Sequence, residues 1–189
     1  MCIRDRYAAT AQLYDEQTDY IDTRRIELIG SRSGQLNENW TLTASIHALR
    51  ERWKLELEDE NGDGAEAAAP YRYATYVYPQ LEAQYVSVDD RLFPRSGIVA
   101  RSTLRGGLEG AGSDTNFAQL QVGASWFKGI GANDRFILRG EIGQTSAGSP
   151  DALPPSLRFY AGGDNSIRGY QYREVGPRVR TEGCLLYTS

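Results

Sequence analysis

Apolar side chains recur at every second position through much of this chain, and this period of two restricts its fold more than any other feature. Residues 115–127 show the pattern most clearly. Their apolar members are Ala118, Leu120, Val122, Ala124 and Trp126, and the residues between them are Gln119, Gln121, Gly123 and Ser125. Successive side chains of a β-strand point to opposite faces, so the pattern predicts a strand with one apolar and one polar face.

Other segments repeat this alternation, which predicts an all-β chain with about seven strands. They are residues 9–16, 24–32, 40–55, 80–87, 96–109 and 135–144. Within 40–55 the alternation changes phase near Leu49 and Arg50, which we interpret as a β-bulge. No stretch approaches the roughly 18 apolar residues that a transmembrane helix needs.

The lengths of these segments and of their connections favour a transmembrane β-barrel. Strands of about ten residues can cross a bilayer when they are tilted. Long connections at 57–72 and 145–175 accompany shorter ones at 89–97 and 128–134, which resembles the division into long loops and short turns in outer-membrane barrels. A soluble β-sandwich or lipocalin-like barrel also alternates, but the charges and glutamines of the polar faces favour a wet lumen.

On this interpretation, the apolar faces contact lipid. Trp40, Tyr78 and Trp126 are expected to form an interfacial aromatic girdle near the strand ends. An arginine at Leu138, near the midplane of the lipid face, should destabilise the barrel by about 2–4 kcal/mol. Gly143 lies on the predicted lumen face and should tolerate the same substitution.

The two ends of the chain match translated sequencing-adapter DNA, MCIRDR in one sense and CLLYTS in the other. We therefore expect residues 1–6 and 184–189 to be adapter-derived and 7–183 to be a partial outer-membrane barrel domain. Both cysteines, Cys2 and Cys184, lie in these ends, so no disulfide is predicted. With 21 Lys and Arg against 25 Asp and Glu, interspersed in sign, the chain is not expected to bind nucleic acid.

A glycine-rich motif, RFYAGGDNSIRGYQYREVGP at 158–177, carries the most specific signal. It resembles the sixth-loop signature of the outer-membrane barrel-assembly superfamily, the BamA/TamA or bacterial surface antigen type, whose core reads Val/Ile-Arg-Gly-Phe/Tyr. Within that superfamily the chain is most similar to TamA, the outer-membrane subunit of the translocation and assembly module. The matching residues are Gly162, Gly163, Asp164, Ile167, Arg168, Gly169 and Tyr170.

The resemblance implies a 16-stranded antiparallel barrel preceded by periplasmic POTRA domains, of which this chain is a fragment of about seven strands plus the inward-folded sixth loop. Arg168 is implied to pair with acidic groups on the inner wall, with Gly169 allowing close approach and Tyr170 packing beside it. Gly162 and Gly163 would permit the re-entry turn. The usual acidic partners would lie beyond this chain, unless Glu141 or Asp164 substitutes.

The function implied is non-catalytic insertion or translocation of β-barrel and autotransporter proteins at the bacterial outer membrane. The implied partners are the outer-membrane lipid bilayer, client barrel or autotransporter proteins, and a TamB-like inner-membrane protein that spans the periplasm. Neither cofactor nor enzymatic activity is expected. Two alternatives stay open: a two-partner secretion transporter of the same superfamily, and a passive outer-membrane pore.

Two further signals are weak. Residues 59–64 (DENGDG) begin like a calcium loop, but Pro70 stands where the loop needs a bidentate glutamate, so an acidic solvated loop is favoured over a weak calcium site. His47 is the only histidine, which leaves little for a zinc site or a Ser-His-Asp triad. We expect His47 to be a polar residue that faces the lumen.

Overall fold

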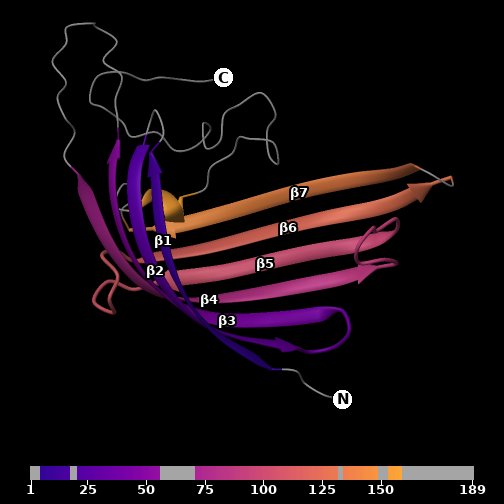
Figure 1. Ribbon diagram of the computed structural model, residues 1–189, viewed down its shortest axis with the longest axis horizontal. Helices are drawn as coiled ribbons and strands as arrows, with labels where there is room; N and C mark the ends of the chain where they lie inside the picture. The colour runs from indigo at the N-terminus through magenta and orange to yellow at the C-terminus, as the bar shows by residue number, and fades with distance from the viewer. Residues whose placement is uncertain (1–4, 18–20, 56–70, 132–133, 149–152, 159–189) are drawn as a thin grey trace, which may run out of the picture.

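The described part of the chain forms one antiparallel sheet of seven strands, hydrogen-bonded in sequence order (Figure 1). The computed structural model describes residues 5–17, 21–55, 71–131, 134–148 and 153–158. The strands are β1 (Arg6–Gln17), β2 (Ile21–Gln35), β3 (Trp40–Leu55), β4 (Arg72–Val88), β5 (Gly97–Gly107), β6 (Phe117–Ile130) and β7 (Asp134–Ala147), followed by a 3₁₀-helix, η2 (Pro155–Leu157). In this part of the chain, no helix is long and apolar enough to cross a membrane.

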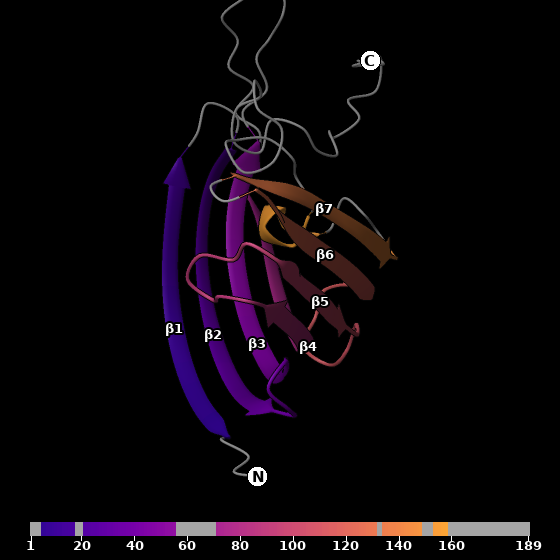
Figure 2. The ribbon, with the colours of Figure 1, turned by 90° about the vertical axis from the view of Figure 1, so that its right-hand side faces the viewer.

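The sheet is strongly curved, and η2 lies on its concave side (Figures 1 and 2). All seven strand segments predicted from the alternation are present, with differences at their ends. β1 starts at Arg6, one residue inside the segment expected to be adapter-derived, and Asp5 Oδ2 lies 2.6 Å from Arg32 Nη2. The adapter origin of the two ends remains a prediction.

The predicted bulge in β3 is wrong. β3 pairs without interruption with β2 and with β4, and the register does not shift at Leu49 or Arg50. The inward residues continue in phase as Ser45, His47, Leu49, Glu51 and Trp53, all buried. What changes along the strand is the chemistry of the inner face, which becomes apolar at Leu49 and Trp53 because a later segment of the chain packs there.

β4 begins at Arg72, eight residues before the predicted start, and includes Pro79. It pairs with β5 only from Gln80 onward. Before that point, the β5–β6 connection covers its edge: Ser113 Oγ accepts from Val77 N (3.2 Å) and donates to Val77 O (2.9 Å). Pro79 follows Val77 by two residues, so its missing N–H falls on this edge, where proline is tolerated.

The outward face is largely apolar over β5, β6 and β7, as predicted. Leu104, Leu120 and Leu138 are each about half exposed on it. Aromatic pairs Trp40–Tyr85 and Trp126–Phe136 lie on this face near the short turns, with ring centroids 5.0 and 6.1 Å apart. Tyr78 was expected in this girdle, but it is 2% exposed on the inner face. Its neighbours there are polar or aromatic, so its ring fills the barrel interior rather than contacting lipid.

Candidate functional site

The motif residues predicted to form the site lie outside the described residues: Gly162, Gly163, Asp164, Ile167, Arg168, Gly169 and Tyr170. The segment that leads into them, residues 153–158, is described, and it lies against the inner wall. We call residues 153–158 the loop stem. Its contacts fix the position of the chain up to four residues before Gly162, the first glycine of the motif.

Apolar packing fixes the loop stem to β3, β4 and β6. Leu153 and Leu157 are 3% and 1% exposed. They belong to a buried cluster with Leu49, Trp53, Ala74, Tyr76, Tyr78 and Phe117. The Phe117 ring meets those of Tyr76 and Tyr78 edge-on, with centroids 5.5 Å apart in both pairs. A polar, water-filled wall would not hold such a segment, whereas this patch removes two leucine side chains from water.

Glu51 of β3 provides a polar attachment. Its side chain is buried, and its two carboxylate oxygens are shared between the wall and the stem. Oε1 accepts a hydrogen bond from Thr23 Oγ1 of β2 at 2.8 Å. Oε2 accepts one from Ser156 Oγ of the stem. A buried carboxylate needs such donors, so Ser156 and Thr23 together make this position of Glu51 possible.

Gln119 of β6 provides the second attachment, and it is 2% exposed. Its Nε2 donates to the backbone oxygen of Leu157 at 2.5 Å and to Thr145 Oγ1 of β7 at 2.9 Å. Its Oε1 accepts from Arg105 Nε of β5 at 2.7 Å. One side chain therefore ties the stem to three neighbouring strands, and every polar atom of its amide is used.

The stem also closes on itself. Arg158 Nε donates to the Leu153 backbone oxygen at 2.8 Å, and Leu157 N donates to Pro154 O at 3.0 Å. Pro154 and Pro155 are both fully buried. Because proline restricts the backbone to few conformations, the pair holds the stem in the shape that the wall accepts.

A second polar network lies lower on the inner wall, around His47. This residue is 7% exposed and faces the lumen, as predicted. Its Nδ1 lies 2.8 Å from Glu27 Oε1, its Nε2 lies 2.9 Å from Ser45 Oγ, and its ring stacks on Tyr78 at 4.9 Å. The order hydroxyl, imidazole, carboxylate is that of a hydrolytic triad, which the sequence did not suggest because Glu27 comes from another strand.

Other contacts of this network favour a structural role. Glu27 also accepts from Tyr78 OH at 3.5 Å and lies 3.8 Å from Arg25 Nε. Ser45 is 8% exposed, which leaves its hydroxyl little access to a substrate. Among the described residues, no three His, Cys, Asp or Glu side chains group as a metal site; the calcium-like segment 59–64 lies outside them.

Comparison with known proteins identifies the family. The sequence matches the Omp85 superfamily domain over residues 5–184. The chain belongs to the Omp85 superfamily. This confirms the barrel-assembly superfamily predicted from the loop motif, and it places the protein in the bacterial outer membrane. Omp85 proteins are non-catalytic assembly or transport factors, in agreement with the structural interpretation of the His47 network.

A solved structure agrees on the fold. The chain is similar to BamA from Haemophilus ducreyi lacking POTRA domains 1–3, with a TM-score of 0.70 and 16% identity. The match covers 89% of this chain and 35% of the BamA chain. The chain thus spans about a third of that protein, and its curved sheet corresponds to part of an Omp85 barrel.

Sequence reasoning missed Glu51 and Gln119 as the attachments of the stem. Gln119 was assigned to the polar face of its strand, but nothing local indicated that its amide meets residue 157. Glu51 stands two residues from both Leu49 and Trp53 on the inner face. A charged residue between two apolar ones on a lumen face is a signal that could have marked the docking position.

Proposed function

We propose that the complete protein is an outer-membrane assembly factor of the TamA type, which inserts or translocates β-barrel and autotransporter proteins without covalent chemistry. The observation that carries this proposal is the loop stem docked inside the barrel wall, just ahead of the Ile-Arg-Gly-Tyr motif. Membership of the Omp85 superfamily supports the general role, and the motif residues around Asp164 and Ile167 favour the TamA branch.

The mechanism rests on backbone hydrogen bonding. An unpaired strand edge exposes a row of N–H and C=O groups that an incoming strand can match, as in β-augmentation. In the proposed mechanism, the seam of the closed barrel offers such an edge to client strands. A loop braced against the wall keeps the remaining strands in place while the seam opens. A TamB-like protein from the inner membrane is the proposed periplasmic partner.

Arg168 is the proposed tip of this brace. Its guanidinium can make two parallel hydrogen bonds to one carboxylate, and such a pair has one preferred geometry. The stem contacts at Glu51 and Gln119 support the proposal because they start the loop on the inner side of the wall. Gly162 and Gly163 would then turn the chain so that Arg168 reaches its acidic partner.

The test uses the intact gene product, recovered with its flanking sequence and reconstituted in liposomes. A urea-unfolded autotransporter barrel is added, and its folding is followed by heat-modifiable migration in gels. We expect the intact protein to accelerate folding over empty liposomes, and Arg168→Ala to reduce that acceleration. Arg101→Ala is the matched control, since Arg101 is a solvent-accessible arginine paired with Glu82 (3.3 Å) on the inner wall.

The alternatives give different results in the same liposomes. A passive pore would conduct small solutes without accelerating the client. A two-partner secretion transporter would move one dedicated substrate across the bilayer and leave a general barrel client unchanged. Either outcome would overturn the assembly function. If the Arg168→Ala variant accelerates folding as much as the wild type, Arg168 does not act as a brace, but the assembly function stands.

A further inference from the structure

Four cationic side chains gather on the outward face of β2 and β3, at the end where the long connection to β4 begins. They are Arg24, Arg50, Arg52 and Lys54, which we call the basic patch. Arg24 and Arg52 are direct cross-strand partners, and Lys54 is opposite Asp22. Like charges directly opposite each other destabilise a sheet. A bound anion would offset this repulsion in the patch.

The described carboxylates do not supply enough negative charge. Asp15 Oδ2 is 2.6 Å from Arg24 Nη2, and Asp22 accepts from Tyr71 OH at 3.0 Å. Asp114, from the connection that covers β4, accepts from the backbone of Thr75 at 2.7 Å. These three carboxylates are thus already engaged, and only Asp15 forms an ion pair with the patch.

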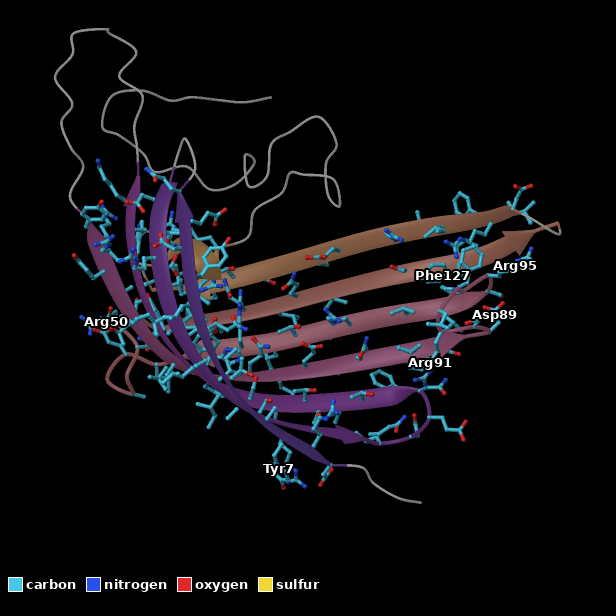
Figure 3. All side chains as sticks on the ribbon, viewed as in Figure 1. Tyr7, Arg50, Asp89, Arg91, Arg95 and Phe127 are labelled. Atoms are coloured by element: carbon cyan, nitrogen blue, oxygen red, sulfur yellow. The ribbon has the colours of Figure 1, made fainter. Side chains whose placement is uncertain are left out.

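Arg50 and Arg52 hold the unmatched charge. Arg50 is exposed and projects from the convex side of the sheet (Figure 3); within the described ranges it has no ion pair. The Arg52 guanidinium lies 4.5 Å from the centre of the Tyr71 ring, and its Nε is buried without a hydrogen-bond partner. The ring holds this guanidinium in one orientation, and its terminal N–H groups rather than the buried Nε are the donors that an oxyanion could meet.

The height of the patch matches the headgroup level of the outer leaflet. Trp40 marks the short-turn interface, and Arg50 lies ten residues further along the same strand. At about 3.3 Å per residue and a tilt near 40°, this is about 25 Å along the membrane normal, the height of the apolar band of an outer-membrane barrel. Long loops are extracellular in such barrels, so the patch faces the outer leaflet.

An apolar groove crosses the same outward face of the sheet, nearer the membrane centre than the patch. It has a volume of about 1040 Å³. Its outward-facing lining includes Ala9, Gly30, Ile46, Pro79, Leu104 and Ala118. A side chain added at Gly30 would meet nothing within 4 Å. Ile46 lies four residues before Arg50 in β3, about 13 Å along the strand, so the groove is deeper in the bilayer than the patch.

We propose that this face is a binding site for the phosphorylated glycolipid of the outer leaflet, lipopolysaccharide. Its phosphate groups are bound by Arg50, Arg52 and Lys54, and its acyl chains lie in the groove below. Charge complementarity favours the phosphates, and the apolar groove on the same face favours a lipid over free phosphate. The inference depends on the outer-membrane location and not on the assembly function.

Native mass spectrometry of the intact protein, released from nanodiscs, tests this site. The nanodiscs contain lipid A, or lipid A with both phosphates removed, in a phosphatidylcholine background. We expect the phosphorylated lipid to be retained more strongly. Since each Lys or Arg near a membrane surface contributes about 1 kcal/mol, Arg50→Gln should weaken retention roughly fivefold and Arg50→Gln with Lys54→Gln roughly thirtyfold. Arg139→Gln, which removes the same charge from the lumen face of β7, should leave retention unchanged.

Several results would overturn the proposal. Equal retention of the phosphorylated and dephosphorylated lipids by the wild-type protein would do so without any variant, including a case where the double variant fails to fold. Loss of retention on adding millimolar inorganic phosphate would indicate a simple anion site. If Arg139→Gln weakens retention as much as Arg50→Gln, the lipid responds to the net charge of the protein and not to this patch. Unchanged retention by the double variant would mean that Arg50 and Lys54 do not bind the lipid phosphates.

Discussion

Glu51 shows, at the scale of one residue, how the inner wall holds the loop stem. Replacing it with leucine leaves Ser156 Oγ without its acceptor, and leaves Thr23 Oγ1 only the longer contact to the Arg52 backbone oxygen at 3.3 Å. A buried hydroxyl without a partner costs about 1–3 kcal/mol, so Glu51→Leu should release residues 153–158 from the wall. Glu51→Gln keeps an oxygen acceptor and adds a donor, and should release them much less. Hydrogen exchange of Leu157 N in the intact protein measures the difference; equal exchange in the two variants would contradict this role.

Asp89 lies in the short turn after β4 (Figure 3). Its carboxylate makes that turn sensitive to acid. Its Oδ1 accepts from the backbone N–H groups of Asp90, Arg95 and Ser96, at 2.9, 2.9 and 3.0 Å. The hydrogen bond from Ser96, with that from Arg95, lowers the pKa of the Asp89 carboxyl below its ordinary 3.8, although partial desolvation opposes the shift. The folded-state pKa is then below the unfolded one. The turn's stabilisation is therefore complete above pH 3.8 and is lost as pH falls through the folded-state pKa.

Amide chemical shifts of Arg95 and Ser96, followed by NMR from pH 6 to pH 2, check this direction. In the wild type we expect the shifts to move with a midpoint below 3.8. Asp89→Asn keeps an oxygen acceptor but cannot titrate, so its shifts should stay constant. A wild-type midpoint above 3.8 would mean that the carboxylate is not the acceptor that orders the turn.

At the scale of strands, the alternation correctly predicted the facing of side chains wherever that facing depends on the strand's own residues. β6 and β7 follow the predicted facing because their outer face meets lipid and, away from the stem contacts at Phe117 and Gln119, their inner face meets water. β3 and β4 depart from it where the stem packs, because their inner faces become apolar through a contact with residues more than 70 positions away in the sequence. The alternation at Leu49 and Trp53 therefore appeared to change phase although the register is continuous. The motif gave the family, but the chain near it did not reveal Glu51 or Gln119.

The cost of placing an arginine on the lipid face of β7 depends on the depth of the residue in the membrane. Leu138 pairs with Trp126, a member of the interfacial aromatic pair, so Leu138 is nearer the interface than the sequence suggested. Ile142 is six residues beyond Phe136, about 15 Å along the membrane normal, and is 73% exposed on the lipid face. Ile142→Arg should therefore destabilise the intact barrel by about 2–4 kcal/mol, and Leu138→Arg by about 0–1 kcal/mol.

Urea titration of the intact protein in lipid vesicles, read by tryptophan fluorescence, gives both free energies of unfolding. Gly143→Arg is the control, because Gly143 lies opposite Gln121 on the lumen face and an arginine there reaches water. A cost for Gly143→Arg equal to that for Ile142→Arg would reverse the assignment of the two faces. Equal costs for Leu138→Arg and Ile142→Arg would contradict the depth assignment.

At the scale of the whole molecule, the curved sheet has the shape of a barrel wall but is open. Within the described ranges, β1 pairs with β2 alone and β7 with β6 alone. Each outer edge exposes alternating N–H and C=O groups over more than ten residues, and β1 is apolar on its lipid side. Lipid cannot satisfy those groups, since unpaired backbone in hydrocarbon costs several kcal/mol per group. Closure must come from further strands, whether from the same protein or from other copies.

The 189-residue chain, produced alone and refolded in detergent, should therefore associate through its edges. Size-exclusion chromatography with light scattering should give dimers or larger species, with the amides of β1 and β7 protected from exchange. Pairs of lysines that point inward at alternate positions of β7, such as Gly143→Lys with Glu141→Lys, should shift the distribution toward monomer by repelling a second copy. A monodisperse monomer whose β1 and β7 amides are protected would show that the seven strands close on one another, and the missing wall would not be needed for the fold.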